Sequence, residues 1–203
     1  MLEEAARRYG AQVDMRWHAY ELRPEPILQP DPDSEYIREH WEKRVLPMAA
    51  ERGLEMKVPR RQVRSRRALQ AALFAQDHGR FREMDYALFR ARFVEDADIS
   101  DIDVLRRLAR ETTLDDEALA YAVTTNSYVD RVNDDNALAV RLGINGVPAA
   151  LVGPEHDDFG EFLRNAEPVV GAVPYDWMAR AIDRALSGES PLARSARCSN
   201  PSS

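Results

Sequence analysis

Gly146-Val147-Pro148 is the stretch whose residue types best fit a functional site, because its proline stands directly before the apolar run 149–152. That run predicts a short strand, and proline has no N–H to give to a strand's hydrogen-bond ladder. A proline is useful there if the neighbouring backbone groups must stay open to a bound chain. An ordinary turn proline is the alternative interpretation, since most X–Pro bonds in folded proteins are trans.

Thiol chemistry within this polypeptide is limited by its cysteine content. Cys198 is the only cysteine, and it lies in a polar segment near the end of the sequence. A dithiol–disulfide cycle within one chain needs two thiols, the first of them activated by a helix N-terminus or a cation. The 203 residues therefore cannot run that cycle by themselves. A single cysteine also excludes an intrachain disulfide framework, which fits a reducing compartment.

Other polar groups have structural interpretations that we favour over catalytic ones. The arginines between 60 and 67 have no aromatic residues among them, so a solvated loop before a helix is preferred to a phosphate or acidic-partner site. Adjacent side chains of the acidic run 155–158 point in different directions, so a solvent loop is preferred to a metal site. The histidines are scattered, and none pairs in sequence with a nucleophile; they are His18, His40, His78 and His156.

The composition is that of an ordinary globular protein. Hydrophobic residues make up 44% of the chain and charged residues 31%, enough for a core and a well-solvated surface. The net charge of −7 gives no reason to expect nucleic acid or an anionic membrane as a partner. No targeting segment and no run of about 18 apolar residues is visible. We therefore expect a cytoplasmic protein without membrane partners.

The elements that position the tripeptide can be predicted from hydrophobic periodicity. Residues 12–20 alternate apolar with polar positions, as in a half-buried strand. Residues 54–58 alternate as well and predict a short edge strand or an extended connection. Four prolines exclude helix from 24–32. Ser34 is predicted to cap a helix that runs to about residue 52, which Pro47 should kink or interrupt.

The second half of the chain is predicted to be mostly helical. Apolar residues recur every three to four positions from 65 to 143. Ser100 and Thr113 are predicted to open two helices as capping boxes, because an aspartate follows each of them three residues later. Pro174 opens a last helix. The Ser-, Pro- and Arg-rich residues 189–203 are predicted to be disordered.

Three segments resemble DsbA-type thioredoxin domains, and the FrnE-like branch in particular. LGINGVPAALVG, residues 142–153, resembles the helix end, cis-proline loop and strand of that family. LFRARFVEDADISDIDVLRRLA, residues 88–109, resembles the branch's inserted helices. AYELRP, residues 19–24, resembles its Phe-x-Leu-x-Pro loop, with Tyr20 where the family usually has Phe. The resemblance covers about residues 1–187.

The resemblance implies an α/β fold, a thioredoxin-like sheet with an inserted all-helical subdomain. It divides the chain into a truncated N-terminal part of the thioredoxin-like domain, an inserted helical subdomain, a C-terminal part and a disordered tail, at residues 1–64, 65–126, 127–188 and 189–203. It also implies that Gly146, Val147 and Pro148 form a cis-proline loop in a substrate groove. The partner implied for that groove is a peptide or a protein thiol, and a homo-oligomer is left open.

One departure from the family pattern is large. The family opens with a strand followed by Cys-x-x-Cys, whereas residues 1–10 resemble the back half of the next helix. The resemblance therefore implies that the first strand and the catalytic turn are absent from this chain. That strand would lie between 12–20 and 149–152, so we expect unpaired backbone groups there, at about 1–3 kcal/mol each when buried. The chain should be marginal alone unless something fills the gap or the two flanking strands pair directly.

Two classes of function remain open. The first is a DsbA/FrnE-like thiol–disulfide oxidoreductase family member whose dithiol is missing and which is inactive as written. The second is a non-catalytic thioredoxin-like module that binds a peptide or partner at the cis-proline loop. A weaker third class is kinship with 2-hydroxychromene-2-carboxylate isomerase and kappa-class glutathione transferases, whose serine position is also missing. No catalytic residue, cofactor or metal is expected within this chain.

Overall fold

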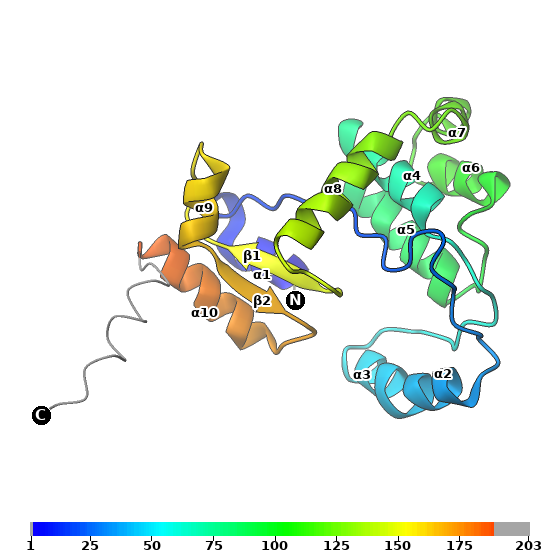
Figure 1. Ribbon diagram of the computed structural model, residues 1–203, viewed down its shortest axis with the longest axis horizontal. Helices are drawn as coiled ribbons and strands as arrows, with labels where there is room; N and C mark the ends of the chain where they lie inside the picture. The colour runs from blue at the N-terminus through cyan, green and yellow to red at the C-terminus, as the bar shows by residue number, and fades with distance from the viewer. Residues whose placement is uncertain (1, 189–203) are drawn as a thin grey trace, which may run out of the picture. The chain divides into compact units, whose positions relative to one another are not determined.

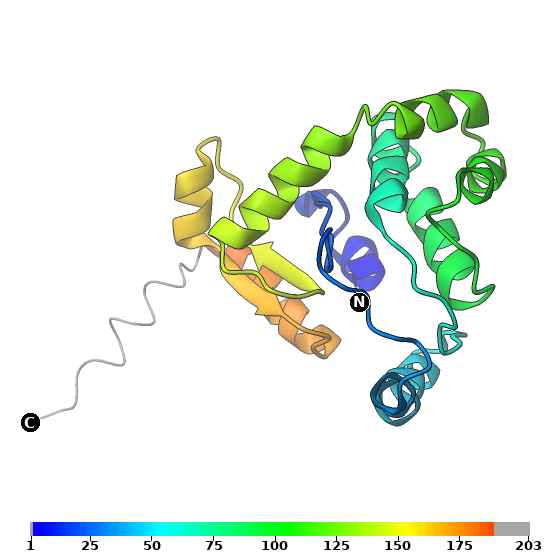
Figure 2. The same cartoon turned by 45° about the vertical axis from the view of Figure 1, so that its right-hand side comes forward.

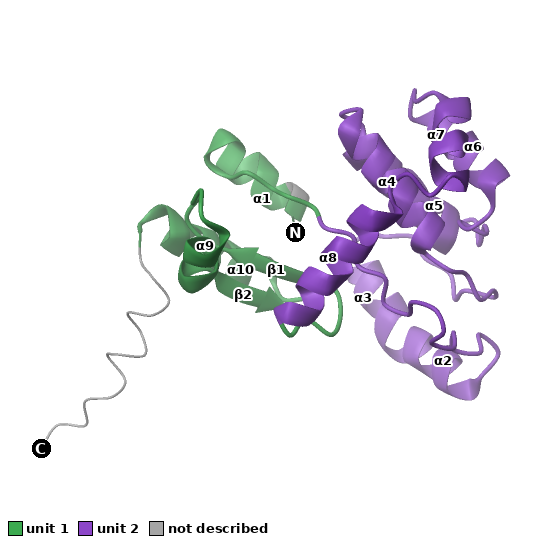
Figure 3. Ribbon diagram, turned by 45° about the horizontal axis from the view of Figure 1, so that its top comes forward, with its two compact units in different colours: residues 1–17, 143–203 green, residues 18–142 purple. Residues whose placement is uncertain are grey.

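The computed structural model describes residues 2–188, and the chain divides into two compact units (Figure 3). Unit 1 comprises Met1–Trp17 and Gly143–Ser203, and unit 2 comprises His18–Leu142. Helices dominate both units, and the described residues contain one small sheet of two strands. The finer sequence-based division at residues 64, 126 and 188 stays a prediction, and the predicted disordered tail lies outside the described residues.

Unit 1 combines elements from both ends of the sequence. In chain order these are α1 (Leu2–Tyr9), a 3₁₀ turn (Gly10–Gln12), β1 (Ala149–Val152), α9 (Phe159–Asn165), β2 (Glu167–Val170) and α10 (Tyr175–Leu186). The strands are antiparallel, with Ala149 opposite Val170 and Val152 opposite Glu167. Helix α10 lies along this pair (Figure 1). The buried apolar residues that join α1, β2 and α10 are Ala5, Tyr9, Val169, Met178, Ala181 and Ile182.

The strand predicted at 12–20 is wrong, although its alternation is real. Val13, Met15 and Trp17 are half-buried, and the residues between them are exposed. The segment has a local backbone hydrogen bond, from Val13 N–H to the carbonyl of Gly10 at 3.4 Å, and no residue from 13 to 20 belongs to a strand. Extended backbone becomes a strand only when another strand pairs with it. The segment does not pair with β1, whose partner is β2, so the two segments flanking the missing strand do not join directly.

Unit 2 is entirely helical among its regular elements. Its helices are α2 (Glu35–His40), α3 (Leu46–Glu51), α4 (Arg66–Asp77), α5 (Phe81–Phe93), α6 (Ile102–Glu111), α7 (Asp116–Thr124) and α8 (Val129–Arg141). Helices α4 to α7 gather side by side, and α8 lies against α4 (Figures 1 and 2). Their shared core is rich in alanine, which lets the helices approach closely, and its largest fully buried side chains are Met84, Leu105, Leu108, Leu119 and Val123. The helical pattern predicted from residue 65 onward is therefore confirmed.

The helix predicted after Ser34 is confirmed, with an irregularity before Pro47. Ser34 Oγ accepts a hydrogen bond from the N–H of Ile37 at 3.4 Å. A π-helical turn, Trp41–Val45, separates α2 from α3. Pro47 cannot donate to the carbonyl one turn earlier, and its ring crowds that carbonyl. Widening the preceding turn relieves this conflict, so the helix continues instead of breaking.

Two predicted helix caps are wrong by one or two residues. Asp101, and not Ser100, caps α6 by accepting from the N–H of Asp103 at 2.9 Å. Asp115, and not Thr113, caps α7 by accepting from two N–H groups of its first turn at 3.0 and 2.9 Å. A carboxylate directly before the helix satisfies these donors and also complements the helix dipole.

Residues 54–58 form an extended connection and do not pair with another strand. This was one of the two predicted outcomes. None of the helices within residues 2–188 combines the length and the apolar character needed to cross a bilayer.

Candidate functional site: the turn before β1

The turn Gly146-Val147-Pro148 lies directly before β1 in unit 1. The Val147–Pro148 peptide bond is cis, as predicted from its position before the strand. Helix α8 ends at Arg141, Leu142 caps it, and Gly143 follows with a φ of 69°, a conformation that favours glycine. The N–H of Gly171, just after β2, donates to the carbonyl of Pro148 at 2.8 Å. This bond extends the two-stranded ladder by one step and fixes the turn to it.

Val147 is the residue of this turn that is exposed to solvent and whose backbone groups are unpaired within residues 2–188. The residue is 57% exposed, and neither its N–H nor its carbonyl has a hydrogen-bond partner within residues 2–188. Exposed backbone groups next to a strand can pair with an extended chain, as an edge strand does. The turn from Asn145 to Ala149 carries no ionisable side chain, and Val170, across the ladder from Ala149, is 62% exposed. The arrangement can therefore bind extended backbone beside apolar side chains.

Two of the arginines between 60 and 67, Arg64 and Arg66, bind the loop that precedes α2 in unit 2. Arg64 Nη1 donates to the carbonyls of Arg23 and Ile27 at 2.8 and 2.9 Å. Arg66 forms a 2.8 Å ion pair with Glu21, whose side chain is only 2% exposed. Because these guanidinium groups already have protein partners, they are poorly suited to gripping a separate phosphate.

The acidic run 155–158 also consists of residues with local contacts. Asp158 caps α9 through a 2.8 Å bond from the N–H of Glu161, and the N–H of Asp158 lies 3.2 Å from His156 Nδ1. Glu155 pairs with Arg16 at 3.4 Å. Among residues 2–188, no cluster of three or more His, Cys, Asp or Glu side chains has the arrangement of a metal site. Cys198, the sequence's one thiol, lies outside the residues that the structure describes.

One pairing could not be read from the sequence. His18 Nδ1 lies 2.7 Å from Asp135 Oδ1, and the other oxygen of Asp135 accepts from the N–H of Ala19 at 2.7 Å. The partners are 117 residues apart, so no local pattern links them. Asp135 thereby ties residues 18 and 19 to α8. The aromatic residues near this segment are not open to solvent: Tyr9 is buried in the core, and Trp17 and Tyr20 are half-buried.

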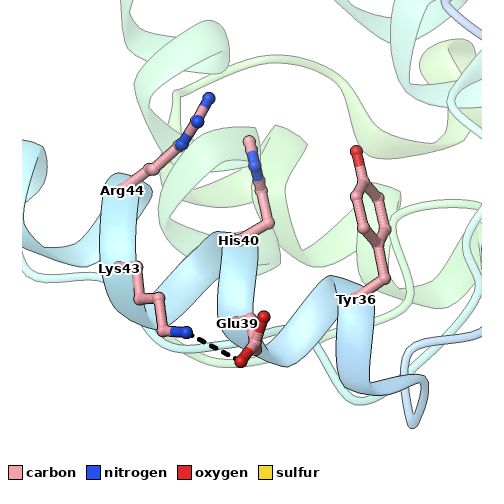
Figure 4. A pocket seen from close by; sticks show the side chains of 5 residues that line it. All are labelled: Tyr36, Glu39, His40, Lys43 and Arg44. Atoms are coloured by element: carbon pink, nitrogen blue, oxygen red, sulfur yellow. Dashed lines mark hydrogen bonds and ion pairs between the residues drawn. The ribbon is translucent and has the colours of Figure 1, made fainter.

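A shallow hollow of about 290 Å³ lies on α2 and the π-helical turn of unit 2. Figure 4 shows Tyr36, His40 and Arg44 projecting from one side of this segment. Lys43 and Glu39 neutralise each other in a 2.7 Å ion pair, and the rings of Tyr36 and His40 stack with centroids 6.2 Å apart. All residues that line the hollow come from the segment 36–44, so the hollow is less enclosed than typical ligand sites.

The combination of a helix, a cis-proline turn, an antiparallel strand pair and a closing helix is that of a thioredoxin-like domain. The chain belongs to the DSBA-like thioredoxin domain family, whose model matches residues 1–183. The uncharacterized protein YwbO of Bacillus subtilis is 34% identical over 155 residues, which cover 74% of this chain and 76% of that protein.

The crystal structure of a probable DsbA oxidoreductase from Streptomyces coelicolor has the same fold. It superimposes with a TM-score of 0.67 at 23% identity, and the match covers 86% of this chain and 76% of that one. The family and the coarse fold predicted from the sequence are therefore confirmed. The narrower assignment to the FrnE-like branch stays a prediction.

Proposed function

We propose that this chain binds extended segments of other polypeptides at Val147, as a DsbA-like protein without a redox dithiol of its own. The observation that carries the proposal is the exposed, unpaired backbone of Val147, held in place beside β1 by the bond from Gly171 to Pro148. An extended peptide that pairs with these groups gains main-chain hydrogen bonds, and exposed Val170 offers apolar surface to its side chains. A peptide thiol is the substrate class that family membership suggests.

The proposed function is binding and not thiol–disulfide oxidoreductase activity, because the 203-residue sequence has only one cysteine. A thiol–disulfide cycle within one chain passes through an internal disulfide, which one thiol cannot form. In an insulin reduction assay, the purified 203-residue chain should not accelerate precipitation above the dithiothreitol blank. Acceleration by this chain would contradict the proposal.

Binding can be tested with reduced, carboxymethylated α-lactalbumin, a permanently unfolded chain without free thiols. Val147→Pro removes the N–H that we propose as a donor, so its dissociation constant should rise by about tenfold. Val147→Ala keeps the backbone and should bind within about threefold of the unmodified chain. Val140→Ala is the matched control, because Val140 is 75% exposed and lies in unit 2.

Circular dichroism must show that Val147→Pro is folded for the comparison to count. Unchanged affinity of a folded Val147→Pro variant would overturn the proposal. Equal losses in Val147→Pro and Val140→Ala would also contradict it, because the effect would then be unspecific. If Val147→Pro does not fold, the amide-exchange measurement on the unmodified chain, given at the end of the Discussion, decides the matter.

A further inference from the structure

A second surface, in unit 2, carries a row of half-buried and exposed aromatic side chains that we call the aromatic strip. It consists of Trp41, from the π-helical turn, and Phe93, Phe89 and Tyr86, from α5. The ring centroids of Trp41 and Phe93 are 5.7 Å apart, as are those of Phe93 and Phe89. Tyr86 lies one turn before Phe89 and is 69% exposed, while Phe89 is 57% exposed.

Three residues of the strip, Tyr86, Phe89 and Phe93, lie on the outer face of α5, whose inner face is already packed into the core. Met84, Leu88 and Ala91 of α5 are buried in the core shared with α4, α6 and α7. The strip residues 86, 89 and 93 follow the spacing of three and four residues that defines a second face of the same helix. A helix that is apolar on two faces normally has a partner on each of them.

The size of the strip favours a small partner over a second copy of this chain. An aromatic side chain offers 150–250 Å² to a partner, so the exposed fractions of Tyr86 and Phe89 leave roughly 250 Å² to cover. A stable protein–protein interface needs about 800 Å² from each partner. Two or three apolar anchors on a short segment match the strip better.

The charges at the two ends of the strip indicate the chemistry of that segment. Arg82 lies one turn before Tyr86, and Lys57 lies at the other end, where its N–H donates to the carbonyl of Phe93 at 2.7 Å. Both residues are exposed cations, although the chain as a whole carries a net charge of −7. Exposed cations at an aromatic surface attract carboxylates.

We propose that the aromatic strip binds a short, acidic, amphipathic segment of another protein, with apolar side chains on Tyr86, Phe89 and Phe93 and carboxylates at Arg82 and Lys57. Aromatic residues and arginine are the residue types that most often dominate such contacts. The surface belongs to unit 2, and the proposal does not depend on peptide binding at Val147 in unit 1.

The probe is a short synthetic amphipathic helix, labelled with fluorescein, with leucines on one face and glutamates on the other. Its twin carries lysine in place of every glutamate. Fluorescence anisotropy should show that the acidic peptide binds the full chain at least about tenfold more tightly than the basic twin. Tyr86→Ala should weaken this binding by about tenfold, and Arg82→Glu should reverse the preference between the twins.

Tyr121→Ala is the matched control, because Tyr121 is 71% exposed on α7 of the same unit. It should leave the affinity unchanged. Equal binding of the two twins, or equal losses in Tyr86→Ala and Tyr121→Ala, would overturn the proposal. So would a dimer, seen by sedimentation in the absence of peptide, that Phe89→Ala converts to a monomer, because a second copy would then be the partner.

Discussion

The hydroxyl of Tyr9 donates a 2.7 Å hydrogen bond to Asp183 Oδ1, joining α1 to α10 across 174 residues of sequence. The same hydroxyl lies 3.1 Å from the carbonyl of Ala179. Burial of the ring, followed by the bond to Asp183, raises the pKa of Tyr9 to about 12. Since α10 also packs along the β1–β2 pair, this contact connects the beginning of unit 1 to the sheet that positions Val147.

Tyr9→Phe should lower the free energy of unfolding by about 2 kcal/mol, because it removes a hydrogen bond to a charged group and keeps the ring. Urea denaturation followed by circular dichroism measures this change. Tyr121→Phe is the control, since the Tyr121 hydroxyl forms no hydrogen bond within the described residues. Equal stability of the two variants would mean that the Tyr9–Asp183 bond contributes nothing.

Alkaline pH should destabilise unit 1 through ionisation of Tyr9. The folded protein holds the Tyr9 proton more tightly than the unfolded chain, whose tyrosines titrate near 10. Stability from this group is therefore complete below pH 10 and is lost as the pH rises from about 10 to about 12. Urea midpoints across this range should fall less steeply for Tyr9→Phe than for the unmodified chain. Parallel curves would contradict the assignment.

Arg66→Ala should destabilise the chain by about 3 kcal/mol, because it leaves the carboxylate of Glu21 buried without its cation. Arg67 is a neighbouring arginine that is exposed, and its side chain donates a hydrogen bond to the carbonyl of Ser100 at 3.0 Å. Arg67→Ala should therefore cost less than about 1 kcal/mol. Thermal unfolding of the two variants gives the comparison, and similar losses would show that Glu21 does not need Arg66.

Gly153→Ala should destabilise unit 1 by about 1–3 kcal/mol, because the added methyl group overfills a packed position. It would lie 2.9 Å from the Cα of Ala166, which is a backbone atom and cannot move independently. At Gly146 the same methyl group meets nothing within 4 Å, so Gly146→Ala should leave the unfolding midpoint almost unchanged. A larger loss at Gly146 than at Gly153 would contradict the close approach of Gly153 to Ala166.

Local periodicity predicted the helices well and the sheet poorly. Three- to four-residue spacing identified α4 to α8 and α10, because the apolar faces of these helices are set by nearby residues. The alternation at 12–20 correctly gave the half-buried positions, but a strand also needs a partner, which alternation cannot reveal. The caps at Asp101 and Asp115 were missed because several polar residues precede each helix and only geometry selects among them.

The candidate site was predicted to a similar degree. The proline before an apolar strand pointed to Val147, since both features are local. The contacts that hold unit 2 together, His18 with Asp135 and Arg66 with Glu21, join distant parts of the chain. Their individual residues carry no signal of pairing, so they require the folded structure.

The most direct test of the central claim is amide exchange at Val147 in the full chain. NMR should show fast exchange of the Val147 N–H in the free protein, because this group is exposed and unpaired. Saturation with reduced, carboxymethylated α-lactalbumin should slow that exchange by at least about tenfold, as expected for a hydrogen-bonded amide. Val147 exchange that stays unchanged while the unfolded chain is demonstrably bound would contradict the proposal that Val147 is the binding site.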